Sequence, residues 1–150
     1  MDQITDNVYL GNSSDAKNAN LLQVNGIKSV LNVAIDLDYG KEWASQTFYD
    51  ILPCKVGLID GRGNSFDKFV LAVKTLNYLS DMGKVLIHCH EGRSRSPAVL
   101  AAFLACKDKI SFDDALRSIW QKRQIVNPAP PLVDLGVKFV EKFSTPAKGE

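Results

Sequence analysis

One cysteine and one arginine in this chain have the spacing of a thiol nucleophile and a phosphate-binding guanidinium. Cys89 is followed by five residues and then by Arg95. A free thiol has a pKa of about 8.5, and a helix N-terminus or nearby cations lower it to roughly 3.5–7.5. Cys89 would then be a thiolate that can attack phosphorus, while the planar fork of Arg95 holds two phosphate oxygens. The spacing predicts two-step phosphoryl transfer to the cysteine and then to water.

The segments on either side of this pair predict a strand, a loop and a helix. Residues 85–87 form a short apolar run that is typical of a buried strand, and residues 97–106 are nearly all apolar, as in a buried helix. The loop between them has N–H groups without helical partners at the positive end of the helix dipole, which favours anion binding. Gly92 allows the backbone to approach a ligand, and Ser96 and Pro97 are expected to cap and begin the helix.

Further residues of the loop are expected to assist this chemistry. Ser96 can donate a hydrogen bond to the sulfur as it leaves the phosphocysteine intermediate. We expect His88 to support the loop by bonding to backbone groups rather than to act as a base. The residues expected to bind the phosphorylated substrate are His90, Glu91, Gly92, Arg93, Ser94 and Arg95. Of these, His90 is expected to contribute its N–H with its side chain in solvent, and Arg93 is either a surface charge or a recruiter of anionic substrates.

The leaving oxygen needs a proton, which a mobile carboxylic acid usually supplies. Asp60 lies in the glycine-rich stretch 58–64, after an extended segment that ends near Cys54. One helix and one strand separate this stretch from Cys89, a connectivity that can bring it to the rim of the phosphate site. Asp67 is the alternative, but it falls inside an amphipathic helix pattern. We therefore favour Asp60 as the general acid.

The residues around Cys89 resemble the dual-specificity branch of the cysteine-dependent protein tyrosine phosphatases. The His-Cys-x5-Arg-Ser signature is matched by residues 88–96, and the resemblance extends over roughly residues 4–143. It implies protein phosphatase activity without metal or cofactor, with Asp60 as general acid. It also implies the α/β fold of that family, a central mixed sheet flanked by helices with the phosphate-binding loop between a central strand and a buried helix.

Two positions depart from the pattern of this family. Glu91 stands where members often carry a small residue, and a carboxylate there opposes an anionic substrate unless it points away or pairs with Arg93. Members often have Pro-Asn before the last helix, where the asparagine braces the phosphate loop, whereas here Ala129 takes that place. Asn127 is the residue that we expect to substitute as loop support.

Composition and length are typical of a single enzyme domain. The chain has 150 residues, a net charge of +1 and three cysteines without paired spacing. These values predict no nucleic-acid partner and a reducing compartment, with Cys54 and Cys106 as inert core thiols. No signal-peptide pattern or membrane-spanning stretch occurs, so we expect a cytoplasmic, monomeric protein that does not contact membranes. Residues 1–143 are expected to form the catalytic domain and residues 144–150 a flexible tail.

The pattern of apolar residues and turn formers also predicts the secondary structure. Strands are expected near residues 8–10, 29–33, 48–52 and 85–88. Helices are expected near residues 15–25, 65–81, 96–107, 112–123 and 131–143. We expect Trp43 and Trp120 to serve packing rather than recognition.

Three functions remain open from the sequence. The first is a phosphatase of phosphotyrosine in proteins, with or without activity on phosphoserine and phosphothreonine. The second is a phosphatase of phosphoinositides or RNA 5′ ends, although the loop lacks the extra lysines of phosphoinositide-directed relatives. The third is a phosphate-binding module without turnover, against which the joint presence of Cys89, Arg95, Ser96 and Asp60 argues. A metal site is not expected, because a single cysteine with adjacent histidines lacks the spaced ligands of a zinc site.

Overall fold

The computed structural model describes residues 1–38 and 50–144. The strands are β1 (Asp2–Gln3), β2 (Val8–Gly11), β3 (Ile27–Ala34), β4 (Leu52–Leu58) and β5 (Lys84–His88). The helices are α1 (Ser13–Ala16), α2 (Ala19–Val24), α3 (Phe66–Met82), α4 (Arg95–Asp108), α5 (Phe112–Lys122) and α6 (Pro130–Phe143).

The strands form one mixed sheet in the order β1-β2-β5-β3-β4. Strands β2, β5, β3 and β4 are parallel, and β1 pairs with β2 in the antiparallel direction. Parallel strands end at the same edge of a sheet, which is where ligands bind in open α/β folds. The loops after β2, β3, β4 and β5 therefore meet at one edge. The predicted α/β class with a central mixed sheet is confirmed.

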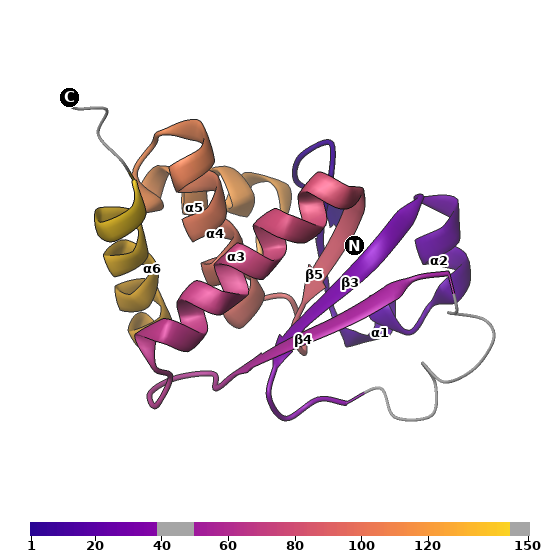
Figure 1. Ribbon diagram of the computed structural model, residues 1–150, viewed down its shortest axis with the longest axis horizontal. Coiled ribbons are helices and arrows are strands. Elements are labelled where there is room, and N and C mark those ends of the chain that lie inside the picture. The colour runs from indigo at the N-terminus through magenta and orange to yellow at the C-terminus, as the bar shows by residue number, and fades with distance from the viewer. Residues whose placement is uncertain (39–49, 145–150) are drawn as a thin grey trace.

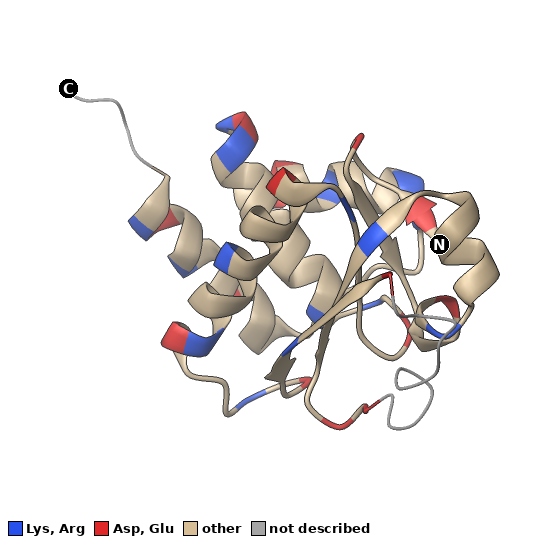
Figure 2. Ribbon diagram, turned by 45° about the vertical axis from the view of Figure 1, so that its right-hand side comes forward, with Lys and Arg blue, Asp and Glu red and all other residues tan. Residues whose placement is uncertain are grey.

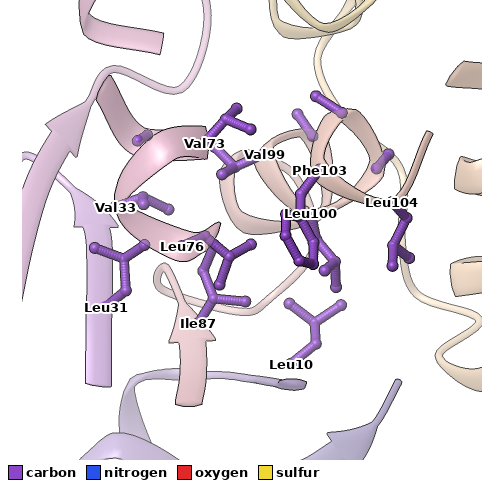
Figure 3. Packing of buried hydrophobic residues seen from close by; sticks show 14 of the residues in the cluster. Leu10, Leu31, Val33, Val73, Leu76, Ile87, Val99, Leu100, Phe103 and Leu104 are labelled. Atoms are coloured by element: carbon purple, nitrogen blue, oxygen red, sulfur yellow. The ribbon is translucent and has the colours of Figure 1, made fainter. Parts of the chain in front are cut away.

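Helices cover both faces of the sheet, with α3 to α6 on one side and the short α1 and α2 on the other (Figure 1). The larger core lies under α3 and α4, where Leu31 and Ile87 of the sheet meet Leu76 and Leu100 (Figure 3). Helix α4 is buried from Arg95 to Ala105, which agrees with the buried helix that its apolar sequence predicts. The loop before α4 is thus attached to the most enclosed helix of the molecule.

The strand predicted at 48–52 is wrong in position. Strand β4 begins at Leu52 and ends at Leu58, while residues 48–49 lie outside the described residues. Strand β4 continues through Pro53 and Gly57, and its position at the edge of the sheet tolerates the proline.

The single helix predicted at 15–25 is two short helices. Asn12 and Asn18 each cap one of them, because the Asn12 side chain accepts a hydrogen bond from the N–H of Asp15 and that of Asn18 from the N–H of Leu21. The second cap ends α1 and starts α2 within the predicted span.

Charged residues of both signs are interspersed along the ribbon in Figure 2, in line with the net charge of +1. Within residues 1–38 and 50–144, no helix is long and apolar enough to cross a membrane. The predicted tail beyond Ser144 and the side chain of Trp43 lie outside the described residues.

Candidate active site

A pocket of about 380 Å³ opens at the edge of the sheet where the parallel strands end. Strand β5 ends at His88 and α4 begins at Arg95, so the six residues 89–94 form the connecting loop. The pocket is lined by Asp60, Cys89, His90, Glu91, Arg93, Ser94 and Arg95. The structure thus brings together the residues proposed as nucleophile, phosphate ligand and general acid, from two loops that are far apart in the sequence.

Five consecutive carbonyl groups of this loop, from Cys89 to Arg93, accept hydrogen bonds from groups outside the pocket. Their donors are His88 Nδ1 for Cys89, Ser13 N–H for His90, Arg123 for Glu91 and Gly92, and Asn127 N–H for Arg93. The N–H groups of Arg93 and Ser94 lie close enough to the Cys89 sulfur to lower its pKa. The backbone is therefore held with carbonyls engaged elsewhere and N–H groups available to an anion.

Arg123, just beyond the end of α5, is a loop support that the sequence analysis did not single out. Its Nε donates to Gly92 O at 3.0 Å and its Nη2 to Glu91 O at 2.7 Å, while its Nη1 pairs with Asp2 Oδ2 at 2.7 Å. Gly92 has φ +68°, and a Cβ there would collide with the Gly11 carbonyl oxygen and lie 2.8 Å from Arg123 Nη2. Only glycine fits this turn.

Cys89 is buried, with 3% of its surface exposed, and its Sγ lies 3.1 Å from Ser96 Oγ. Burial raises the pKa of Cys89, but hydrogen bonds from Ser96 and from the backbone of Ser94 and Arg93 outweigh it and leave the pKa below its ordinary value. The expectation that Ser96 caps α4 is wrong. The helix begins at Arg95 with Ser94 as N-cap, so Ser96 lies inside the first turn with its hydroxyl beside the sulfur.

Arg95 is buried to 5% exposure and fixed through one of its terminal nitrogens. Its Nη1 donates to Asp36 Oδ1 at 2.7 Å and to Leu58 O at 3.2 Å. Its Nε is buried and has no hydrogen-bond partner within residues 1–38 and 50–144, so a phosphate oxygen would satisfy it.

Asp36 is a second residue that the sequence analysis missed. The hydrogen bond from Arg95 holds the pKa of the Asp36 carboxyl below its ordinary value. The His90 side chain is exposed to solvent, as expected, but its Nε2 also lies 3.1 Å from Asp36 Oδ2. The buried Asn32 shapes the turn after β3, because its amide donates to Leu37 O at 2.6 Å. Asp36 could have been found from its position in the sequence, because it follows a predicted strand, and loops after parallel strands meet at one edge of the sheet.

Asp60 is held at the rim of the pocket. Its Oδ1 accepts a hydrogen bond of 2.6 Å from Ser94 Oγ. Asn64 closes the loop that carries it, because the Asn64 side chain donates to Ile59 O at 2.7 Å and accepts from Ile59 N–H at 2.8 Å. Asp67 lies in the first turn of α3 with its side chain exposed and is not among the residues that line the pocket. The structure therefore places Asp60 rather than Asp67 beside Cys89.

The segment before α6 braces the loop through its backbone. Asn127 N–H donates to Arg93 O at 2.7 Å, and Ala129 N–H donates to Ser94 Oγ at 2.9 Å. The Asn127 side chain is exposed, so the support expected from it comes from its main chain. Glu91 and Arg93 are both exposed at the rim, and no ion pair joins them among the described residues.

His88 lies buried beneath the loop. Its Nδ1 donates to the carbonyl of Cys89 at 2.9 Å. Burial lowers the pKa of His88 to about 4, so the ring is neutral at physiological pH and acts through hydrogen bonding.

Comparison with known proteins agrees with this geometry. The family model for the dual specificity phosphatase catalytic domain matches residues 8–135. Human dual specificity protein phosphatase 4 is 29% identical over 122 residues, which cover 81% of this chain and 30% of that protein. A probable rhodanese domain-containing dual specificity protein phosphatase of Dictyostelium discoideum is 31% identical over 132 residues, covering 83% of this chain and 25% of that protein. The chain thus spans less than a third of the length of these relatives.

Solved structures show the same fold. The crystal structure of human DUSP28 superposes with a TM-score of 0.82 at 19% identity, covering 95% of this chain and 96% of that one. The crystal structure of PTPMT1 in complex with PI(5)P has a TM-score of 0.77 at 18% identity and covers 95% of each chain. The resemblance inferred from the signature is confirmed: the chain belongs to the dual specificity phosphatase family.

Proposed function

We propose that this protein is a metal-independent phosphomonoester hydrolase that removes phosphate from phosphotyrosine in proteins through a phosphocysteine intermediate, with phosphoserine and phosphothreonine as further substrates. The observation that carries the proposal is the pocket itself. The thiol of Cys89, whose pKa is lowered, the guanidinium of Arg95 and the carboxyl of Asp60 all line it, which supports their proposed roles.

In the first step the Cys89 thiolate attacks phosphorus, and a sulfur–phosphorus bond forms as the bond from phosphorus to the leaving oxygen breaks. Arg95 and the loop N–H groups bind the remaining phosphate oxygens, where negative charge is concentrated in the transition state. Asp60, in its protonated form, transfers its proton to the leaving oxygen. The Ser94 hydroxyl at 2.6 Å holds that carboxyl at the rim.

In the second step a water molecule attacks the phosphocysteine, and the Asp60 carboxylate accepts its proton. The sulfur–phosphorus bond breaks, and inorganic phosphate leaves. Ser96 Oγ, 3.1 Å from Sγ, donates a hydrogen bond to the sulfur as its negative charge returns. The enzyme is then back in its starting protonation state.

Protein substrates fit this rim better than inositol lipids. Residues 90–94 contain one acidic and one basic side chain, Glu91 and Arg93, and no lysine that would bind further phosphates of an inositol ring. PTPMT1, a structural neighbour, was solved in complex with PI(5)P. At 18% identity, the similarity to PTPMT1 supports a shared fold and does not extend to a shared substrate. Phosphoinositides and 5′-phosphorylated RNA therefore belong in the test as competing substrates.

The experiment compares wild type with Cys89→Ser, Asp60→Ala and Asp67→Ala on phosphotyrosine, phosphoserine and phosphothreonine peptides, an inositol phospholipid and 5′-triphosphorylated RNA, with EDTA present. We expect turnover of phosphotyrosine peptides that Cys89→Ser abolishes. Asp60→Ala should lower kcat about 100-fold or more, as loss of a general acid does, while phosphate still binds. Asp67→Ala is the matched control and should behave as wild type.

Activity that survives in Cys89→Ser would contradict the proposed nucleophile. A loss in Asp67→Ala with normal turnover in Asp60→Ala would move the general acid to Asp67. Faster turnover of the lipid or the RNA than of every phosphopeptide would overturn the substrate class.

A further inference from the structure

A second pocket lies directly beside the proposed active site. It has a volume of about 410 Å³ and is formed by α5 and the segment that leads to α6. Leu116, Trp120 and Val126 contribute apolar surface, while Asp113 and Arg117 stand at its borders. We name it the Trp120 pocket.

A single stretch of backbone separates the two pockets. Asn127 and Pro128 line the Trp120 pocket, whereas Arg93 lines the phosphate pocket. Asn127 N–H donates to Arg93 O at 2.7 Å, so the two pockets lie on either side of this hydrogen bond. The two linings are thus in direct backbone contact, so the residues that flank a phosphorylated residue bound at Cys89 are the ones that can reach the Trp120 pocket.

Trp120 is not part of the core, although we expected it to pack there. Helix α5 buries Phe112, Ala115 and Ile119, and Trp120 lies off this face with 46% of its surface exposed. An indole of this exposure beside an open pocket is the kind of residue that dominates binding interfaces, because it offers a large apolar area and few rotatable bonds.

The charges around the pocket favour an uncharged occupant. Asp113 and Arg117 are one acid and one base, and Arg117 already pairs with Asp114 at 3.2 Å. The apolar part of the lining comes from Leu116, Trp120, Val126 and Pro128. Because Arg117 is engaged by Asp114, Asp113 is the uncompensated charge of this lining, so the site does not attract a phosphate or a carboxylate and gains from burying apolar surface.

We propose that the Trp120 pocket is a specificity subsite that binds a large apolar side chain, such as leucine or phenylalanine, within three residues of the phosphorylated residue of a protein substrate. This inference rests on the proposed function, and it narrows the substrate to phosphoproteins that carry such a side chain near the phosphate. Aryl phosphates, which have no flanking residues, bind at Cys89 without using the subsite.

The first experiment measures kcat/KM for phosphotyrosine peptides that carry leucine, alanine or aspartate at each of the three positions on either side. At one position leucine should exceed alanine by about 10-fold, mainly through KM, as burial of an apolar side chain predicts. In Trp120→Ala the preference for leucine over alanine should disappear. For each variant, kcat/KM on the peptides is divided by kcat/KM of the same variant on an aryl phosphate, so that a general loss of activity cancels. Tyr78→Ala, which removes an exposed aromatic residue of α3, is the matched control and should keep the preference.

A second experiment reads binding without turnover. The chain has two tryptophans, so Trp43→Phe leaves Trp120 as the one indole reporter. In a Cys89→Ser background, a leucine-containing phosphopeptide should change the Trp120 fluorescence saturably. Inorganic phosphate alone should leave that fluorescence unchanged.

The outcomes separate this inference from the proposed function. Equal kcat/KM for leucine and alanine peptides at all six positions, with aryl phosphate still hydrolysed, would overturn the subsite and leave the phosphatase standing. A leucine preference that persists in Trp120→Ala would also overturn it. No turnover of aryl phosphate or of any phosphopeptide by wild type would overturn the proposed function, and the subsite with it.

Discussion

Asp36 Oδ1 lies 2.7 Å from Arg95 Nη1, so the loop after β3 contacts the arginine that is proposed to bind phosphate. The buried Nε of Arg95 has no hydrogen-bond partner within residues 1–38 and 50–144. Because the hydrogen bond from Arg95 lowers the pKa of Asp36, the carboxylate stays ionised, and the contact is lost only as the pH falls through that lowered value. We infer that Asp36 positions Arg95 and so affects phosphate binding through it.

We predict that Asp36→Asn lowers kcat/KM for an aryl phosphate by about 10-fold and weakens inhibition by vanadate, because a charge-assisted hydrogen bond to Arg95 is lost. Steady-state kinetics with vanadate titration measures both effects. Asp38→Asn is the control, since Asp38 pairs with Lys55 at 2.7 Å and does not contact Arg95. Equal effects of the two substitutions would argue against this role of Asp36.

Arg123 allows a similar test of the loop itself. Arg123→Ala removes the donors to Gly92 O and Glu91 O, so we expect vanadate affinity to fall about 10-fold and the free energy of unfolding to drop by about 1–3 kcal/mol. Urea unfolding and vanadate inhibition are the measurements. Asp2→Asn removes only the ion pair and should cost about 1 kcal/mol or less. Wild-type vanadate affinity in Arg123→Ala would refute the role of this side chain in holding the loop.

The lowered pKa of Cys89 predicts how the reactivity of its thiol depends on pH. Alkylation by iodoacetamide follows the thiolate fraction, so Cys89 should react at lower pH than Cys54 and Cys106, whose pKa values are raised by burial. Ser96→Ala removes a hydrogen bond that favours the thiolate, which raises the pKa of Cys89 and moves its profile to higher pH. Mass mapping of alkylated peptides across a pH series distinguishes the three thiols.

The control for this prediction is Ser118→Ala, which removes a hydroxyl that bonds within α5 to Ala115 O. Its Cys89 profile should match that of wild type. An unshifted profile in Ser96→Ala, or a Cys89 that reacts only at the pH of Cys54, would show that the hydrogen bonds around the sulfur do not stabilise the thiolate.

The local parts of the fold and site could be predicted from the sequence. The strand at 85–88 and the helix after residue 95 are continuous apolar runs, and the signature lies between them, so the loop and its flanks were located correctly. Strand β4 was misplaced because Pro53 and Gly57 are tolerated at a sheet edge, a property of the tertiary arrangement. The break between α1 and α2 is local, because the Asn18 side chain caps α2 by accepting a hydrogen bond from the N–H of Leu21.

The residues that were missed act across long sequence separations. Asp36 is 59 residues from Arg95, and Arg123 is 31 residues from Gly92. No local pattern marks either residue, because their roles depend on which loops meet at the sheet edge and on which side of α5 faces the loop. Asn127 was chosen for its side chain, whereas its backbone N–H makes the contact, and backbone geometry cannot be read from residue type.

The most direct test of the account is to trap the phosphoryl group on the protein. Wild type is mixed with a phosphotyrosine substrate, quenched in acid within one turnover, and analysed by peptide mass spectrometry. The account predicts one added phosphoryl group on the peptide that contains Cys89 in wild type. It predicts the same group in Asp60→Ala when an aryl phosphate with a good leaving group is the substrate, because that first step needs no general acid whereas hydrolysis of the phosphocysteine needs the carboxylate. Turnover of substrate with no phosphoryl group on Cys89 in either protein would contradict the central claim.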